Sequence, residues 1–183
     1  IGQMKGKVMR PATESEMADV VRGPGPFVLH GGGTRAIGAA QGAVVETSGL
    51  SGVTLYEPGA LTLVAWAGTP LDEIGVALAA EGQRLAFEVP HMGAVLGRDG
   101  ASTIGGVVAA NASGPRRVQV GACRDALLGV RFVSGHGEVI KNGGRVMKNV
   151  TGYDLTKLIA GSHGTLGVIT EVSFKVQAIP EAE

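Results

Sequence analysis

The chain has 183 residues, enough for one domain or two small subdomains with a substantial core. Its 16 Lys and Arg residues balance its 16 Asp and Glu residues, so no net charge attracts nucleic acid or an anionic membrane. A single Cys excludes an internal disulfide, and 4 % aromatic residues argue against stacking on single-stranded bases. Glycine is the outlier: 31 residues without a collagen repeat predict many turns and close backbone approaches.

The first third of the chain predicts one helix and several short strands. Residues 8–10 are expected to be extended, and Thr13 and Glu16 form a capping box for a helix. Met17, Val20 and Val21 make the apolar face of that helix, which ends at the Gly-Pro-Gly-Pro run after Arg22. Four strands separated by turn residues are expected at 27–30, 44–46, 53–56 and 61–67.

The middle third predicts two helices separated by an extended segment and a loop. The first begins at Pro70, with two acidic residues in its first turn, and stops near Gly82. Residues 84–89 are expected to be extended, and residues 88–100 show no period and are expected to be a loop. The second helix is expected around Gly106 and ends at the Gly-Pro of positions 114–115.

The stretch 101–113 breaks the usual rules for a buried helix. Ile104, Val107 and Val108 share one face, and Asn111 falls on the same face, with Ser102 or Thr103 as the N-cap. Two glycines in the first turn cost helix stability, so they indicate close approach of a ligand or of another backbone. A tightly packed helix with a hydrogen-bonded Asn explains the pattern equally well.

The last third predicts more strand than helix. Residues 129–133 and 138–141 flank a Ser-Gly-His-Gly turn and predict a hairpin. Asp154 is expected to cap a short helix that Gly161 ends, and residues 168–176 predict a long strand.

A triple glycine followed by Thr34 ends the strand at 27–30. Such a loop can turn several backbone N–H groups towards phosphate oxygens. Gly31, Gly33 and Ala36 also satisfy the nicotinamide-dinucleotide fingerprint, with Glu57 as the acidic residue, which makes a nicotinamide-dependent dehydrogenase one hypothesis. That fold needs a long amphipathic helix directly after the glycines, and residues 36–43 show none.

Three glycine-rich stretches together carry a resemblance to a known family. HGGGTRAIG, ASTIGGVVAANASG and GSHGTLGVITEVSFKV resemble FAD-linked oxidases of the vanillyl-alcohol oxidase and p-cresol methylhydroxylase (PCMH) type. GPRRVQVGACRDALLGVRF and GGRVMKNVTGYDLTKLIAGSHGTLGVITE are similar to FAD-binding subunits of bacterial glycolate oxidases. The resemblance runs from Val8 to Val176; His163 occupies a position that is often acidic in relatives.

This resemblance implies an α+β fold, a two-lobed PCMH-type FAD-binding domain that fills residues 1–183. A small N-terminal lobe is expected at about 8–56 and a larger strand-rich lobe with flanking helices at about 57–178. Because relatives carry a C-terminal substrate domain that we expect to be absent here, we expect the isolated chain not to oxidise glycolate.

The resemblance also implies which residues bind FAD. The triple-glycine loop binds the pyrophosphate in this family, the second stretch lies along pyrophosphate and flavin, and the third presents backbone to the adenosine. These roles carry over to Gly31, Gly32, Gly33, Thr34, Arg35 and Gly38, then to Ser102, Ile104, Gly105, Gly106, Ala109, Asn111 and Gly114, and finally to Gly167, Val168 and Ile169. Pro90 is a further residue expected to bind the cofactor.

No catalytic residue is identified with this resemblance. His91 is a weak candidate for the base, and Arg116 or Arg117 for the cation that holds a carboxylate. Thr34 and Arg35 stand where relatives with covalent flavin carry a His, and Cys123 has apolar neighbours, so we expect non-covalent FAD. The four His residues lie far apart, and no metal site is expected.

The function implied is that of a FAD-binding subunit or fragment of a 2-hydroxy-acid oxidase or dehydrogenase acting on glycolate. The expected partners are FAD, a small 2-hydroxy acid, a second flavin subunit and an iron–sulfur subunit, and no nucleic acid. We expect a cytoplasmic location, peripheral to the inner membrane through the partner subunits. The alternative is a non-catalytic assembly subunit that keeps the fold with an empty flavin site.

Overall fold

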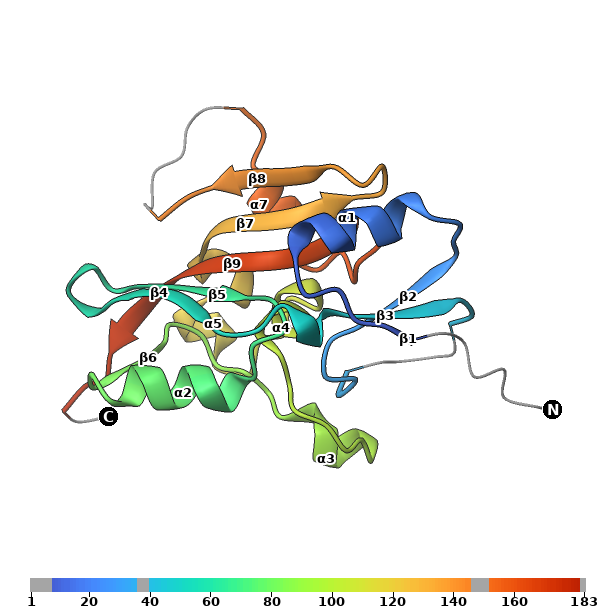
Figure 1. Cartoon of the computed structure of the whole chain (residues 1–183). Helices are drawn as coiled ribbons and strands as arrows, with labels where there is room; N and C mark the ends of the chain where they lie inside the picture. Colours follow the sequence, from blue (N-terminus) through green and yellow to red (C-terminus); the bar gives the residue numbers. More distant parts are fainter. Residues whose placement is uncertain (1–7, 36–39, 146–151, 182–183) are drawn as a thin grey trace.

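The computed structural model describes residues 8–35, 40–145 and 152–181, and it contains two β-sheets (Figure 1). A three-stranded sheet has the order β1-β3-β2. A six-stranded sheet has the order β4-β5-β9-β7-β8, and β6 pairs with β9 beside that path. Helices and strands are thus mixed along the chain, in agreement with the predicted α+β class.

The three-stranded sheet is parallel and is formed by the N-terminal part of the chain. It contains β1 (Val8–Met9), β2 (Phe27–His30) and β3 (Ala43–Glu46). Helix α1 (Glu14–Arg22) connects β1 to β2, and Thr13 caps it by accepting a hydrogen bond from the Glu16 N–H at 3.1 Å. The capping box therefore predicted this helix correctly.

The six-stranded sheet is antiparallel throughout. Its strands are β4 (Val53–Glu57), β5 (Thr62–Trp66), β6 (Gln83–Leu85), β7 (Leu127–Ser134), β8 (Val139–Gly143) and β9 (Gly167–Ala178). Two short 3-10 turns lie at Thr47–Gly49 and Pro58–Ala60. The accompanying helices are α2 (Leu71–Ala79), α3 (Met92–Leu96), α4 (Ile104–Ala109), α5 (Arg117–Val120), α6 (Cys123–Ala126) and α7 (Leu155–Ile159).

Two clusters of buried apolar side chains hold these elements together. The larger lies between the six-stranded sheet and α2, α4 and α7, and its aromatic members Phe87 and Phe174 have ring centroids 5.4 Å apart. The smaller joins Met17 of α1 and Val45 of β3 to Val133 and Val168 of the larger sheet. This smaller cluster therefore connects the two sheets.

Three predicted features differ in the structure. Helix α4 ends at Ala109, and Asn111 has a left-handed backbone with φ of 44°, so Asn111 does not continue the apolar face of the helix. Helix α3 forms within the segment predicted to be a loop. Strand β4 pairs with β5 in the larger sheet, so a boundary near residue 56 divides a hairpin.

None of the helices among the described residues has the length and apolar character needed to cross a bilayer.

Candidate functional site

The loop that follows β2, residues 31–35, lies directly against the segment that precedes α4. A Cβ atom added to Gly32 would lie 1.6 Å from the Ala101 carbonyl oxygen, and one added to Gly100 would lie 2.3 Å from the Gly32 carbonyl oxygen. A Cβ on Gly31 would lie 2.5 Å from Thr103 Oγ1. The two backbones are so close that side chains cannot separate them, which explains these glycines. We call residues 31–35 the glycine loop.

Gly33 is required for a different reason. No heavy atom lies within 4 Å of the position that its Cβ would take, but its φ of 69° is left-handed. The backbone at Gly33 therefore turns in a way that other residues rarely adopt, while the space beside it stays open.

Arg35 joins the glycine loop to the segments before α4. Its Nη1 donates to Ser102 Oγ at 3.0 Å and its Nη2 to the Pro90 carbonyl at 2.9 Å. The Thr34 and Ser102 hydroxyl oxygens lie 2.9 Å apart. Arg35 Nε is buried without a hydrogen-bond partner, and burial lowers the pKa of Arg35, although a guanidinium stays charged at neutral pH. The site thus holds a cation with an unused donor.

A cavity of about 220 Å³ opens beside this cluster. Thr34, Ser102, Arg98 and His91 contribute to its lining. Ligand pockets for whole cofactors are usually larger, roughly 300–1,000 Å³, so this cavity suits one polar part of a dinucleotide.

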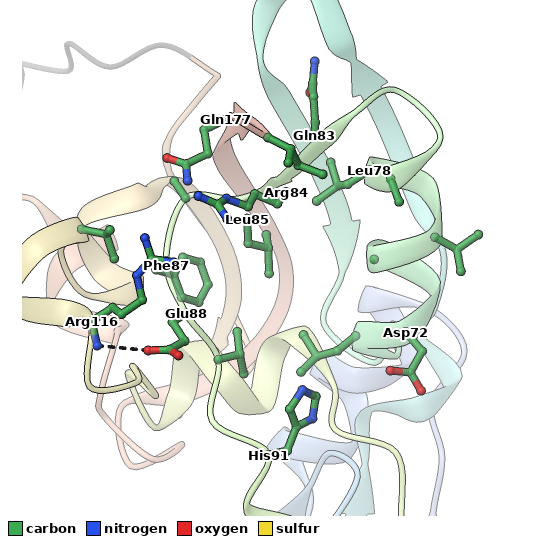
Figure 2. Close-up of a pocket in the computed structure, with 18 residues that line it drawn as sticks. Asp72, Leu78, Gln83, Arg84, Leu85, Phe87, Glu88, His91, Arg116 and Gln177 are labelled. Carbon is green, nitrogen blue, oxygen red and sulfur yellow. Dashed lines mark hydrogen bonds between the residues drawn. The ribbon is translucent and has the colours of Figure 1, made fainter. Parts of the chain in front are cut away.

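Figure 2 shows a second cavity, of about 740 Å³. It shares Leu71, Asp72 and His91 with the first. Apolar side chains such as Leu78 and Phe87 form much of its wall. Arg84, Glu88, Arg116 and Gln177 form a more polar side, where a Glu88 carboxylate oxygen accepts from the Arg116 N–H at 3.0 Å (Figure 2). His91, the weak candidate for a base, is exposed and borders both cavities.

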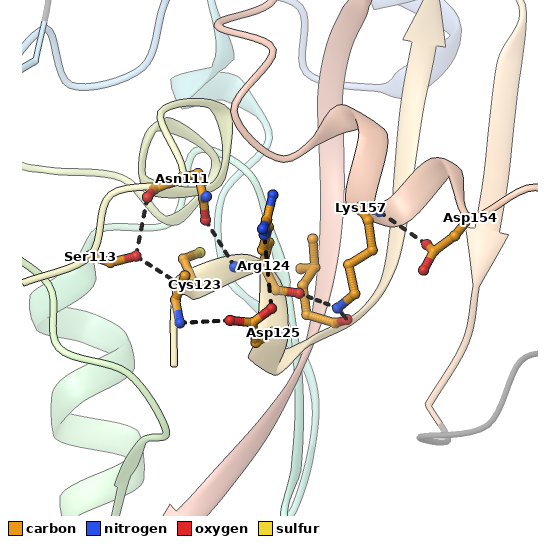
Figure 3. Close-up of polar contacts among 9 residues, drawn as sticks. Asn111, Ser113, Cys123, Arg124, Asp125, Asp154 and Lys157 are labelled. Carbon is orange, nitrogen blue, oxygen red and sulfur yellow. Dashed lines mark hydrogen bonds and ion pairs between the residues drawn. The ribbon is translucent and has the colours of Figure 1, made fainter. Parts of the chain in front are cut away.

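The C-terminal end of α4 has a different character (Figure 3). Asn111 Oδ1 accepts from the Arg124 N–H at 3.0 Å, and Ser113 Oγ accepts from the Cys123 N–H at 3.0 Å. Lys157 Nζ donates to the Leu127 carbonyl at 3.2 Å and also to the Arg124 carbonyl. These contacts join α4, α6 and α7. The Asn111 amide oxygen, expected to lie along FAD, is here the acceptor for the backbone of α6.

The segment 161–163 packs on the same end of α4. The Gly161 N–H donates to the Val108 carbonyl at 3.0 Å, and the His163 N–H donates to the Ala109 carbonyl at 2.8 Å. Ser162 Oγ is buried without a partner. Within residues 8–35, 40–145 and 152–181, Ser162 Oγ and Arg35 Nε are the buried side-chain N or O atoms that lack a hydrogen bond.

The structure brings together only some of the predicted FAD-binding residues. The glycine loop, Pro90, Ser102 and Gly106 form one cluster. Ala109 and Asn111 lie at the far end of α4, and Gly114 packs on Glu88. Gly167, Val168 and Ile169 lie in β9 and pair with β7, and the last two are buried in the core. Gly38 lies outside the described residues.

Two predicted residues have a packing role in the structure. Ile104 is fully buried in the larger core, so its side chain is not available to a cofactor. A Cβ on Gly105 would lie 2.5 Å from Ala67 Cβ, and the Gly105 N–H donates to the Ala67 carbonyl at 2.8 Å, so this glycine lets α4 approach the chain after β5. Close backbone approach, one of the two interpretations of the glycine pair, is therefore correct at Gly105.

Sequence analysis assigned no role to Gly100, or to Ala101 at the start of the stretch 101–113, although the backbones of both residues touch the glycine loop. The available signal was their place immediately before the α4 cap. Cys123 is fully buried, and burial raises the pKa of its thiol to about 12, which agrees with the small core residue expected from its neighbours. Glu57, needed by the nicotinamide hypothesis, belongs to β4 in the other sheet, and its carboxylate lies 3.9 Å from Arg145 Nη1.

Comparison with known proteins shows the family of this chain. A family model described as a FAD binding domain matches residues 6–143. Glycolate oxidase subunit GlcE of Escherichia coli is 42 % identical over 159 residues, which are 86 % of this chain and 44 % of that subunit. A D-lactate dehydrogenase of Archaeoglobus fulgidus is 30 % identical over 177 residues, which are 92 % of this chain and 38 % of that enzyme.

An uncharacterised FAD-linked oxidoreductase of Mycobacterium tuberculosis is 34 % identical over 175 residues, 91 % of this chain and 36 % of that protein. The chain thus spans less than half the length of these relatives. Because the matching family binds FAD, the hypothesis of a nicotinamide-dependent dehydrogenase is rejected. The chain belongs to the FAD-binding domain family of FAD-linked oxidoreductases, and its cofactor is FAD.

Proposed function

We propose that this chain is the FAD-binding part of a 2-hydroxy-acid oxidase or dehydrogenase of the glycolate oxidase type. One observation carries the proposal: among the described residues, the buried side-chain N and O atoms without partners are Arg35 Nε and Ser162 Oγ. Both belong to the glycine-rich stretches for which the resemblance to FAD-linked oxidases implies contacts with FAD. Buried polar groups without partners are rare in native proteins, and a ligand that supplies the missing hydrogen bonds accounts for them.

The pyrophosphate of FAD fits the cluster at the start of α4. The glycine loop offers backbone free of side chains, Thr34 and Ser102 offer hydroxyl groups, and Arg35 offers a cation with an unused N–H. These are the groups that bind phosphate oxygens well. From there a dinucleotide can extend along α4 towards Ser162. We propose that the three-stranded sheet with α1 forms a small lobe, the six-stranded sheet a larger one, and that FAD lies between them.

FAD, when bound, supplies the acceptor for the hydride of the hydroxy acid. The described residues hold and orient the cofactor, and the hydroxy acid would lie on the side of the larger cavity that Arg116 and His91 line. Association with a second flavin subunit and an iron–sulfur subunit is part of the same proposal. It is supported by the similarity to glycolate oxidase subunits, GlcE and also GlcD of Bacillus subtilis, the latter 44 % identical over 82 residues.

Titration of the chain with FAD, followed by flavin fluorescence and absorbance, tests the proposal. We expect saturable binding, and acid precipitation should leave all the flavin in the supernatant, because no His follows the glycine loop and Cys123 is buried as a neutral thiol. A yellow pellet after washing would contradict the non-covalent site. No binding at all would favour the assembly subunit with an empty site.

A further inference from the structure

Helix α1 begins at an ion pair with the six-stranded sheet. The Glu14 carboxylate accepts hydrogen bonds from Arg131 Nε, at 3.0 and 3.1 Å to its two oxygens, and a further one from Arg131 Nη2. It also accepts from Thr170 Oγ1 at 2.6 Å. Arg131 lies on β7 and Thr170 on β9, and Thr170 is fully buried. The Glu14 side chain is only 14 % exposed, so water screens this ion pair weakly.

The other end of α1 is also fixed to that sheet. Arg22 Nη2 donates to the Gly137 carbonyl, in the β7–β8 turn, at 2.7 Å. Between the two ends, Met17 and Ala18 are buried in the cluster that contains Val133 and Val168. Figure 1 shows α1 lying beside β7, next to the small sheet. Helix α1 therefore sets where the three-stranded sheet lies on the six-stranded one.

The proposed FAD site is assembled from both sheets. The glycine loop continues directly from β2 of the three-stranded sheet, whereas Pro90 and Ser102 follow elements of the six-stranded sheet. Contacts also lead from Thr170 towards α4: the Thr170 carbonyl accepts from the Ala67 N–H at 2.7 Å, and the Ala67 carbonyl accepts from the Gly105 N–H at 2.8 Å. The relative position of the two halves of the site depends on how α1 is held.

We infer that Glu14, with Arg131 and Thr170, is a positioning group that sets the affinity for FAD without touching it. The inference rests on the proposed function. When the Glu14 charge is removed, Arg131 loses its buried counter-ion, and the two halves of the site spend less time in the arrangement that binds FAD. The apparent association constant for FAD equals the intrinsic one multiplied by the fraction of molecules that remain in this arrangement, so it falls as that fraction falls. Glu171, opposite Arg131 in the β7–β9 register, stays as a partial counter-charge and limits the loss.

The test compares Glu14→Gln with a matched control, Glu46→Gln. Glu46 also accepts from an arginine, Arg10 Nη2 at 2.6 Å, but both residues belong to the side of the three-stranded sheet. FAD dissociation constants are measured by fluorescence titration at a temperature where circular dichroism shows each variant folded. We expect roughly five- to tenfold weaker binding for Glu14→Gln and less than about twofold for Glu46→Gln.

Two further variants keep the test decisive if Glu14→Gln does not fold. Arg131→Lys keeps the charge and loses the paired hydrogen bonds, so it should give an intermediate affinity. Thr170→Val removes one hydroxyl and should weaken binding about two- to threefold.

A lowered melting temperature with unchanged FAD affinity in these variants would mean a structural role only and would overturn the inference. If the unaltered chain fails to bind FAD, the proposed function fails first and the inference with it.

Discussion

The two ends of helix α4 use similar residue types for different purposes. At its N-terminal end the glycine loop and residues 100–103 touch backbone to backbone, and Arg35 presents a buried, unpaired N–H. At its C-terminal end Asn111, Ser113 and Lys157 hydrogen-bond to neighbouring backbone (Figure 3). The unpaired group there is the neutral hydroxyl of Ser162. The comparison teaches that a cation with an unpaired donor lies at one end of α4, whereas the cation at the other end, Lys157, is used to fix neighbouring backbone.

The largest expected effect is that of Gly32→Ala, at the N-terminal end. The new Cβ would lie 1.6 Å from the Ala101 carbonyl oxygen, so one of the two backbones has to move. We expect a loss of about 3 kcal/mol in stability or more, a fall of about 6–12 °C in melting temperature, and no measurable FAD binding. Gly75→Ala in α2 is the matched control because no atom lies within 4 Å of its Cβ position. If Gly32→Ala melts like Gly75→Ala, the backbone contact is not as close as described.

Arg35→Leu should weaken FAD binding by about 10- to 100-fold, because a hydrogen bond to a charged group contributes about 1.5–3 kcal/mol. Arg35→Lys keeps the charge but cannot reach Ser102 and Pro90 at once, so its affinity should be intermediate. Isothermal titration calorimetry measures both, with the exposed Arg117→Leu as the control. Equal affinities for Arg35→Leu and Arg117→Leu would mean that the Arg35 guanidinium does not contribute to FAD binding.

Asn111→Ala tests the shape of the C-terminal end in the cofactor-free chain. Alanine loses the hydrogen bond to the Arg124 N–H and is strained at a φ of 44°, so we expect a loss of about 2 kcal/mol in stability. Asn111→Gly loses the same hydrogen bond without the strain and should cost about 1 kcal/mol. Thermal unfolding of both variants decides the point. A glycine variant less stable than the alanine variant would show that the left-handed backbone is not the reason for Asn111.

Ser162→Ala should have opposite effects on stability and on binding. Removal of a buried hydroxyl that has no partner should stabilise the cofactor-free chain by up to about 1 kcal/mol, and loss of a donor to FAD should weaken binding about fivefold. Melting curves with and without FAD measure both effects, and the neighbouring Thr165→Ala, whose hydroxyl donates to the Ser162 carbonyl, is the control. Weaker binding without any gain in stability would mean that Ser162 has a protein partner.

The smallest effect near neutral pH is a pH dependence from Cys123, which develops only in alkaline solution. The unfolded thiol has a pKa near 9.0, and burial raises the folded value to about 12, so above pH 9.0 the unfolded state loses the proton first. Stability therefore falls as the pH rises from about 9 to 12, by about 0.8 kcal/mol at about pH 9.5. Denaturant unfolding of the wild type and Cys123→Ala at several pH values isolates this contribution. Parallel pH profiles for the two proteins would contradict it.

Local signals in the sequence predicted most elements but not how they assemble. Thr13 and Asp154 mark helix starts by hydrogen bonds within four residues, so α1 and α7 were predictable. The end of α4 was not, because a left-handed Asn111 follows from contacts with α6, thirteen residues along the chain. The placement of β4 in the larger sheet likewise depends on its pairing with β5 and, through β5, with β9.

The candidate site divides in the same way. The glycine loop was predictable because its residue types alone suit phosphate. Other contacts join segments that are far apart in sequence, and no local pattern marks them. They are the contact of Gly32 with Ala101, the hydrogen bond from Arg35 to Pro90, and the hydrogen bond from Thr170 to Glu14. At Gly105 the sequence correctly predicted a close approach, but it could not predict that the approaching residue is Ala67.

Strand β9 has a consequence for the order in which the protein forms during translation. It pairs with β5, β6 and β7, and residue 62 is opposite residue 175. On the ribosome, β5 therefore emerges long before its neighbour exists, and one of its edges stays unpaired while more than half of the chain is made. Such delayed, long-range pairing slows folding, and it exposes an edge strand with unpaired backbone groups to other nascent chains. A chaperone that shields the β4–β5 hairpin until residue 178 has left the exit tunnel would favour the correct sheet.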